Sequence, residues 1–234
     1  MPQSADPTMP ADPPSFTRFA IYDPGPAPLA DFGARWLGWD TRAGQACAPL
    51  APPAWTEAAC RYGFHATIKP PFRLAEGALV SDLTAALRDL AARLSPVHLQ
   101  GGLVLTDLDG FLALTPRSQP PALTDLAASV VRDLDPFRAP LTEAEIARRR
   151  PETLSQTARA NLDRWGYPHV MEDFRYHMTL TGPLDGSDAA AARAALTPHL
   201  AKLLPDPHPI IELALMAEDQ DGFFHDLTRC RLGG

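Results

Sequence analysis

Apolar residues along the chain alternate between strand-like and helix-like spacing, and this pattern defines the predicted elements. Residues 16–23 form a predicted strand in which Phe19 and Ile21 share one face, because alternate side chains of a strand point the same way. Residues 29–39 are predicted to be helical. A second strand is predicted over 62–74, ending near Pro70-Pro71, since proline is tolerated at strand ends and edges.

Leucines at helical spacing follow this strand. Ser81 is a suitable N-cap, and the apolar positions after it define one helical face; they are Leu83, Leu87, Leu90 and Leu94. Two further apolar runs, 97–108 and 111–115, flank Asp109-Gly110, which is typical of a tight hairpin turn. Residues 122–134 are again predicted to be helical.

A long connector, residues 138–173, separates these elements from a second set. Thr142 and Glu145 form a capping-box pattern that predicts a helix, and a further helix is expected over 151–165, ending at Gly166. The sequence leaves open whether the connector is a lid or packs against one lobe. A strand over 174–180, a helix over 188–204 and a hairpin over 210–232 complete the prediction.

The two sets of elements align when the chain is shifted by 112 residues. His65 then falls on His177, Leu103 on Leu215, and the Asp109-Gly110-Phe111 turn on Asp221-Gly222-Phe223. The shared downstream spacing indicates an internal duplication. We therefore predict an α+β fold in one bilobal domain (16–234), with repeat halves near 16–116 and 117–234. Antiparallel sheets related by a pseudo-two-fold axis would form a central cleft, with the helices outside.

Composition limits the possible functions. The formal net charge of −7 argues against extended nucleic acid as a partner, although a small phosphorylated substrate remains compatible with a few local cations. Three cysteines fit neither a disulfide framework nor a metal-ligand spacing, which favours a reducing, cytoplasmic setting. No apolar run is long enough to span a membrane. Residues 1–15 are predicted to be a disordered tail, and the oligomeric state is left open.

The matching histidines carry the candidate chemistry. Phe64-His65-Ala66-Thr67-Ile68 and Tyr176-His177-Met178-Thr179-Leu180 each place an imidazole and a hydroxyl on one strand face. A single buried histidine is usually structural, whereas two in register, each followed by threonine, indicate acid–base catalysis on a phosphate. His65, Thr67, His177 and Thr179 are therefore the predicted catalytic residues.

Nearby side chains are candidates for substrate binding. Lys69 and Arg61 each lie four residues from His65, so in a regular strand all three side chains would be on the same face. Lys69 is the preferred phosphate contact. The aromatic candidates are Tyr62, Tyr22 and Tyr176, with core packing as the alternative for each. Arg148-Arg149-Arg150 is expected to be a solvated helix end. No metal-ligand spacing or glycine-rich phosphate loop is present, so neither a metal nor a cofactor is predicted.

At these motifs the chain resembles the two-histidine (2H) phosphoesterase superfamily, and most closely its DUF1045 branch, which is associated with phosphonate metabolism. The segments that carry the resemblance are 61–72, 177–182, 36–40 and 165–168. It implies a metal-independent phosphoesterase or cyclic phosphodiesterase in which His65 with Thr67 and His177 with Thr179 form two half-sites. A phosphoribosyl cyclic phosphate or a nucleotide-like ester is one implied substrate. The alternatives are a non-catalytic phosphate-ester or RNA-end binding module, and a 2′-5′ RNA ligase or end-processing protein.

Overall fold

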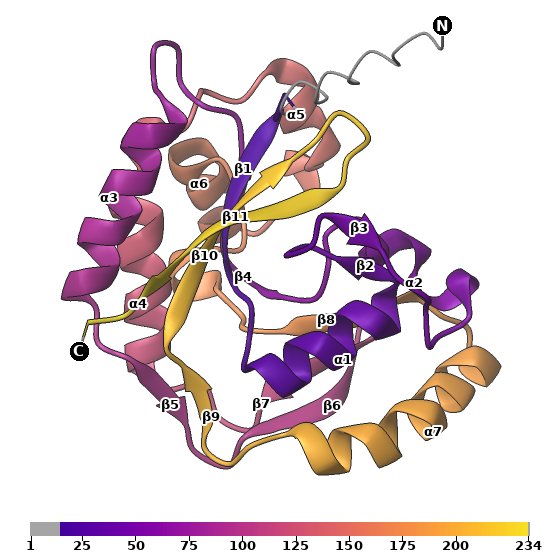
Figure 1. Ribbon diagram of the computed structural model, residues 1–234. Coiled ribbons are helices and arrows are strands. Elements are labelled where there is room, and N and C mark those ends of the chain that lie inside the picture. The colour runs from indigo at the N-terminus through magenta and orange to yellow at the C-terminus, as the bar shows by residue number, and fades with distance from the viewer. Residues whose placement is uncertain (1–14, 234) are drawn as a thin grey trace, which may run out of the picture.

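A computed structural model describes residues 15–233, and all but the last residue of the predicted tail lies outside this range. The chain forms an α+β fold around a seven-stranded sheet of order β11-β10-β1-β4-β8-β7-β6, whose neighbouring strands are antiparallel (Figure 1). Its strands, in sheet order, are Phe224–Arg231, Glu212–Glu218, Arg18–Asp23, Ala66–Phe72, Met178–Pro183, Phe111–Pro116 and Leu103–Leu108. The predicted α+β class with antiparallel sheets is confirmed.

The sheet consists of two lobes that meet at one register pair. Ala66 of β4 faces Met178 of β8, and these residues are 112 positions apart in the sequence. On one side of this pair lie β4, β1, β10 and β11; on the other lie β8, β7 and β6. Each lobe therefore contains strands from both halves of the chain, because the β6–β7 hairpin pairs with β8 while the β10–β11 hairpin pairs with β1.

Elements separated by about 112 residues recur in the same order. A short ribbon joins two of them, since β5 (Val97–Leu99) pairs antiparallel with β9 (His208–Ile210). The apolar run predicted as one strand over 97–108 is divided between β5 and β6 at Gly101 and Gly102. Both have positive φ (78° and 65°), a conformation that glycine adopts readily.

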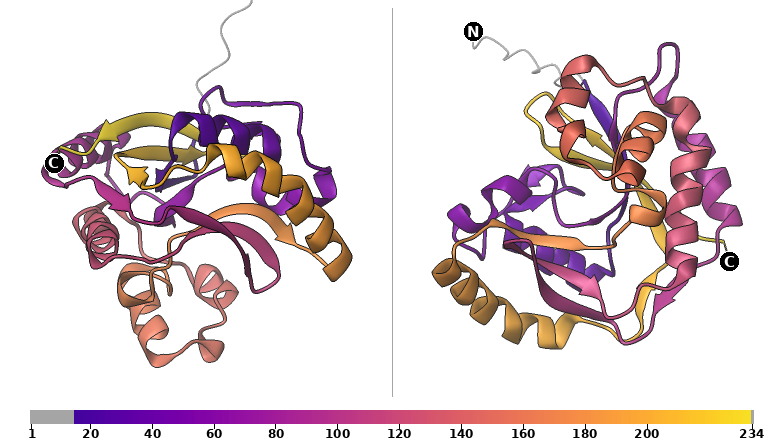
Figure 2. Two further views of the ribbon diagram at one scale, coloured as in Figure 1. Left: turned by 90° about the horizontal axis from the view of Figure 1, so that it is seen from below. Right: turned by 180° about the vertical axis from the view of Figure 1, so that it is seen from behind.

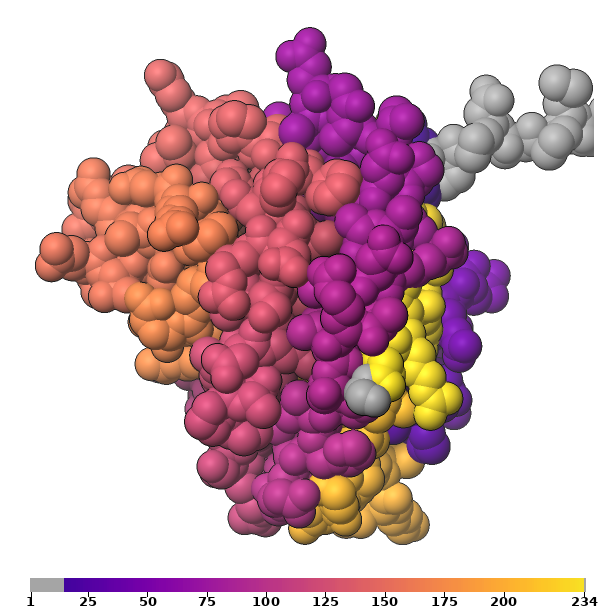
Figure 3. Space-filling model, turned by 90° about the vertical axis from the view of Figure 1, so that its left-hand side faces the viewer, coloured from indigo at the N-terminus to yellow at the C-terminus, as the bar shows by residue number. Residues whose placement is uncertain are grey.

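Helices cover the outside of the sheet (Figure 2). Their bounds are α1 Ala27–Leu37, α2 Pro53–Cys60, α3 Val80–Arg93, α4 Pro121–Asp133, α5 Glu143–Arg148, α6 Gln156–Trp165 and α7 Gly186–Leu203. α3 packs against β10 and β11, and α1 and α2 pack against β8. α3 and α4 lie side by side on one face (Figure 3). Between them, Nη2 of Arg93 and Oδ2 of Asp133 form an ion pair of 3.5 Å.

Several boundaries differ from the sequence prediction for identifiable reasons. Helix α3 begins at Val80 after Leu79, so Ser81 lies inside its first turn and does not cap it. Helix α2 was not predicted; it begins at Pro53, and proline suits the first helical turn. The two-residue strands β2 (Trp39–Asp40) and β3 (Gln45–Ala46) form a separate ribbon.

The connector contains both predicted helices, but the second begins at Gln156 after the N-cap Ser155, and not at Pro151. Thr142 Oγ1 accepts a hydrogen bond from the Glu145 amide (3.2 Å), and the Glu145 carboxylate accepts one from the Thr142 amide (2.7 Å). Helix α6 ends at Gly166, whose φ of 74° is left-handed. Three short 3₁₀ turns, Asp135–Phe137, Pro151–Thr153 and Met171–Asp173, link α4, α5, α6 and β8.

Candidate active site

Each motif histidine lies immediately before its strand and is held by the same hydrogen bond. Nδ1 of His65 is 2.9 Å from the carbonyl oxygen of Gly63, and Nδ1 of His177 is 2.9 Å from the carbonyl oxygen of Arg175. A carbonyl can only accept, so Nδ1 carries the hydrogen in both rings. In the neutral imidazole Nε2 is then unprotonated, which leaves a proton acceptor on each side of the lobe junction.

His65 lies in a more enclosed environment than an ordinary surface histidine. Its Nε2 accepts a hydrogen bond from the Thr67 hydroxyl at 3.1 Å, and its ring stacks on Tyr22 with centroids 3.6 Å apart. Burial lowers the pKa of His65 to about 4, because it disfavours the charged ring. The hydrogen bond to the Gly63 carbonyl acts in the opposite direction and raises this pKa, whereas positive charge on the neighbouring His177 lowers it further. His65 is therefore neutral at pH 7.

A cavity of about 350 Å³ opens beside this pair and is shared by the two lobes. Its wall includes His65 and Thr67 from the first motif and Thr179 from the second. His177 is not part of the wall. Its ring packs edge-on against Phe111, with centroids 6.2 Å apart, and Phe111 does line the cavity. The structure thus brings three of the four predicted catalytic residues to one cavity and places the fourth next to it.

Two of the predicted tyrosines line the same cavity. Tyr22 is almost fully buried beneath His65, while Tyr62 is exposed and stacks on Phe224 with centroids 5.4 Å apart. Tyr22 is thus placed to exclude water from one face of the imidazole, and Tyr62 is an exposed part of the cavity wall.

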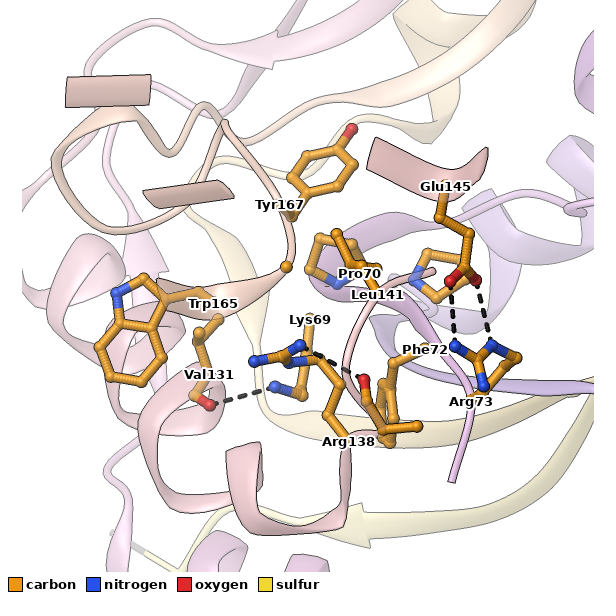
Figure 4. A pocket seen from close by; sticks show the side chains of 13 residues that line it. Lys69, Pro70, Phe72, Arg73, Val131, Arg138, Leu141, Glu145, Trp165 and Tyr167 are labelled. Atoms are coloured by element: carbon orange, nitrogen blue, oxygen red, sulfur yellow. Dashed lines mark hydrogen bonds and ion pairs between the residues drawn. The ribbon is translucent and has the colours of Figure 1, made fainter. Parts of the chain in front are cut away.

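The structure corrects the expectation for Lys69. Its ammonium is buried, donates to the Val131 carbonyl at 3.1 Å and lies 3.5 Å from Asp135. Lys69 lines a second cavity, of only about 20 Å³. Figure 4 shows its side chain there, with Pro70 drawn between it and Tyr167. Lys69 and Thr67 do not share a strand face as predicted, because the β1–β4 pairing is irregular between Ile21 and Tyr22.

Arg61 and Tyr176 are also placed away from the cavity wall. Arg61 is the C-cap of helix α2, and β4 begins only at Ala66. Arg61 is therefore not part of the strand on which it was predicted to share a face with His65. Tyr176 is buried: its hydroxyl donates to the Asp23 carboxylate at 2.6 Å and lies 3.3 Å from His208 Nε2. The core-packing alternative therefore describes Tyr176.

This buried polar cluster lies directly behind the two motifs. Asp23 pairs with Ala66, the residue after His65, and Tyr176 directly precedes His177. Burial raises the pKa of Asp23 to about 6, although hydrogen bonds from Tyr176 and Gly25 favour the carboxylate. Burial likewise lowers the pKa of His208 to about 4. The cluster connects the starts of the two motif strands through side chains.

Sequence reasoning missed several residues of the cavity wall. Those with polar or aromatic side chains are Arg18, Arg149, Tyr167, Thr181 and Phe111. Arg149 was expected on a solvated helix end, but the connector folds back so that its guanidinium lies 4.5 Å from the centre of the Tyr167 ring. The arginine run carried no signal for this, because the fold of the connector decides which arginine faces the cavity.

Within residues 15–233, no group of three or more histidine, cysteine, aspartate or glutamate side chains is arranged to hold a metal ion. Among the same residues, no helix combines the length and the apolar character needed to cross a membrane.

Comparison with known proteins identifies a family match. The sequence model of the family described as "Protein of unknown function (DUF1045)" matches residues 67–225. Among curated proteins, the chain is 36% identical over 222 residues to "Ribose 1,5-bisphosphate phosphokinase PhnN" of Janthinobacterium sp. (strain Marseille), covering 89% of this chain and 49% of that protein. It is 35% identical to the protein of the same name from Laribacter hongkongensis (strain HLHK9), covering 91% and 51%. The chain spans about half the length of these relatives.

Solved structures with a similar arrangement include E. coli LigT complexed with ATP and a crystal structure described as a phosphoesterase. The first is 17% identical with a TM-score of 0.46, covering 94% of this chain and 100% of that chain. The second is 15% identical with a TM-score of 0.44, with the same coverage.

Proposed function

This chain belongs to the DUF1045 family, and from that premise we propose that it is a metal-independent phosphodiesterase that uses its paired His-x-Thr motifs. The observation that carries the proposal is the matched anchoring of His65 and His177, whose Nδ1 atoms each donate to a carbonyl two residues earlier at 2.9 Å. Two imidazoles in the same tautomer, beside two threonine hydroxyls, suit proton transfer on both sides of a phosphorus atom.

The lowered pKa of His65 favours its role as general base. A ring that stays neutral at pH 7 can take a proton at Nε2 from the attacking water, and the protonated form of His177 would give a proton to the leaving alkoxide. The water oxygen forms the new bond to phosphorus as the ester bond breaks. In the free site the Thr67 hydroxyl donates to His65 Nε2; on substrate binding it would turn to a phosphoryl oxygen, which frees Nε2 for the water proton. The Thr179 hydroxyl would donate to the phosphoryl oxygens in the same way, where negative charge develops.

The relatives' name supports a phosphoribosyl substrate in phosphonate metabolism. Opening a 5-phosphoribosyl 1,2-cyclic phosphate at the bond to O2 gives ribose 1,5-bisphosphate, the compound in the name of both curated relatives. Their kinase activity is not part of our proposal, because this chain matches only about half of each. We assign to this chain the hydrolytic step that supplies such a bisphosphate.

Turnover of cyclic phosphates tests the proposal. Wild type, His65→Ala and His177→Ala should be compared on phosphoribosyl and nucleoside cyclic phosphates, with and without a chelator. We expect each variant to lose about 10²–10⁴-fold in rate while retaining its fold, because general acid–base catalysis contributes this much. Chelation should have no effect. Binding without turnover across the panel would support the binding-module alternative instead, and ligation of RNA ends would support the ligase alternative.

A further inference from the structure

The cavity has a cationic wall that the acid–base mechanism does not use. Its two cations are Arg18 and Arg149, and within the described residues no carboxylate side chain lines it. The whole chain carries a formal net charge of −7, so this absence of acidic groups is a local property of the cavity. A concave site lined by one sign of charge attracts ligands of the opposite sign.

The two arginines differ in what already neutralises them. Arg18 is held by Glu218, with Nε and Nη2 each 2.5 Å from a carboxylate oxygen. Arg149 has no ion pair and no side-chain hydrogen bond within residues 15–233. Its guanidinium instead lies over the ring of Tyr167, with Cζ 4.5 Å from the ring centre. Arg149 is therefore the cavity cation whose hydrogen-bond donors are available to a ligand.

Arg149 is fixed at the end of a capped helix and does not extend from a free loop. It follows α5 directly, and the capping box of Thr142 and Glu145 closes the start of that helix. The Glu145 carboxylate also binds Arg73, next to the end of β4, at 3.0 and 3.1 Å. This ion pair lowers the pKa of Glu145 to about 2. The connector is thus fastened to the first lobe close to the motif strand.

We propose that Arg149, positioned by Tyr167, binds a second anionic group of the substrate, a phosphate monoester separate from the reacting diester. A guanidinium stacked on an aromatic ring keeps its N–H edge free, and its fork matches two phosphate oxygens. The location of the reacting diester at His65, Thr67 and Thr179 rests on the proposed function. Recognition of the monoester by Arg149 does not.

The assignment narrows the substrate class. A cyclic phosphate that also carries a terminal phosphate, such as a phosphorylated sugar cyclic phosphate, offers one group to the motif residues and a second to Arg149, all of which line the cavity. A nucleoside 2′,3′-cyclic phosphate without a further phosphate leaves Arg149 unused. The volume of about 350 Å³ lies at the small end of ligand sites, which range over about 300–1,000 Å³. This size suits a sugar phosphate better than an oligonucleotide.

Binding of ribose 5-phosphate, a monoester with no diester to hydrolyse, tests the proposal directly. In titration calorimetry we expect the wild type to bind and Arg149→Met to bind about 10- to 100-fold more weakly, the usual effect of losing hydrogen bonds to a charged group. Arg149→Lys, which keeps the charge but loses the fork, should be intermediate. Arg148→Met is the matched control, because Arg148 does not line the cavity, and should bind like wild type. Equal binding by wild type and Arg149→Met, or no binding by the wild type, would overturn the proposal.

A kinetic comparison separates this proposal from the proposed function. Adenosine 2′,3′-cyclic phosphate should be compared with its 5′-phosphorylated form in wild type and Arg149→Met. We expect wild type to prefer the 5′-phosphorylated compound by about 10- to 100-fold in kcat/KM and the variant to lose this preference. Turnover with no preference in the wild type contradicts the role of Arg149. Absence of turnover on both compounds and on the phosphoribosyl cyclic phosphate contradicts the phosphodiesterase proposal, and the calorimetric result then decides the anion site alone.

Discussion

Gly33 of α1 lies against the ring of Phe64, so closely that a β-carbon at position 33 would be 2.0 Å from Cγ of that ring. Phe64 directly precedes His65, and this contact therefore determines where the first motif begins. The position of the imidazole therefore depends on the absence of a β-carbon at Gly33, in a helix that contributes no group to the chemistry.

Replacing Gly33 should disturb both folding and the site. We expect Gly33→Ala to destabilise the protein by about 1–3 kcal/mol, because the added methyl group overpacks a buried contact, and to lower kcat/KM by displacing His65. Urea unfolding and steady-state kinetics measure the two effects. The control is Gly186→Ala at the start of α7, where an added β-carbon meets nothing within 4 Å. A stable, fully active Gly33→Ala protein would contradict this account.

The pH dependence of kcat/KM should report the enclosed position of His65. If His65 is the general base, activity falls when Nε2 is protonated, so the acid limb should lie near pH 4, where burial has placed its pKa, and well below the ordinary 6.5. Rates measured from pH 3.5 to 8, with the folded fraction followed by fluorescence at each pH, give the limb. A limb near 6.5 would assign the base to another group.

The Tyr22 ring contributes to this enclosure and can be removed. Tyr22→Leu takes away the ring that stacks on His65, admits water to one face of the imidazole and should move the acid limb up toward 6.5. Tyr22→Phe keeps the stacked ring and should leave the limb in place. If both substitutions shift the limb equally, stacking on Tyr22 does not set the pKa of His65.

His208 should make stability depend on pH in the same acidic range. Burial lowers its pKa to about 4, so between pH 6.5 and 4 the unfolded chain binds a proton that the folded protein does not. The free energy of unfolding therefore falls as the pH falls through this window, by up to about 1.4 kcal/mol per pH unit from this group. Above pH 6.5 the contribution is constant.

Substituting His208 isolates that contribution. His208→Gln should show a shallower loss of stability between pH 6.5 and 4 in urea unfolding. Burial raises the pKa of Asp23 to about 6, so below pH 6 this residue increases the free energy of unfolding as the pH falls. Asp23 is present in both proteins, and its contribution largely cancels when the wild type and His208→Gln are compared. His98→Gln on the exposed side of β5 is the control and should keep the wild-type slope.

Lys69 should be dispensable for catalysis although it is close to His65 in sequence. Its ammonium lies in the small second cavity, and burial lowers its pKa to about 8. Lys69→Met should change kcat/KM by less than about threefold, whereas Thr67→Val should lose much more. Asp135 stays paired with Arg138 at 2.7 Å in this variant, so no orphaned charge is expected. A Lys69→Met enzyme with a strongly raised KM would restore the predicted phosphate contact.

The sequence was sufficient to predict those features that depend on a local pattern of residues. Leu83, Leu87 and Leu90 of α3 and the capping box of α5 follow from spacing and turn chemistry, and both are found as predicted. The two histidines lie one residue before the strands on which they were predicted. The signal was insufficient where the position of a side chain depends on tertiary structure. A pairing irregularity between β1 and β4 turned Lys69 away from the cavity, and the fold of the connector brought Arg149 to it.

The interleaved sheet predicts that the two halves of the chain cannot fold separately. Strands β1 and β4 of the first half continue into β10 and β11 of the second, while β8 of the second half depends on β7 and β6 of the first. A fragment of residues 15–116 or 117–234 would expose long strand edges and lose most of its core contacts. We expect each fragment alone to be unfolded by circular dichroism, and the two together to recover the wild-type spectrum and activity. A cut at 116/117 falls between β7 and α4, outside both elements, so failure of the fragments cannot be attributed to a broken helix or strand. A fragment that folds alone would show that the halves are autonomous and that the exchange of hairpins is not required for folding.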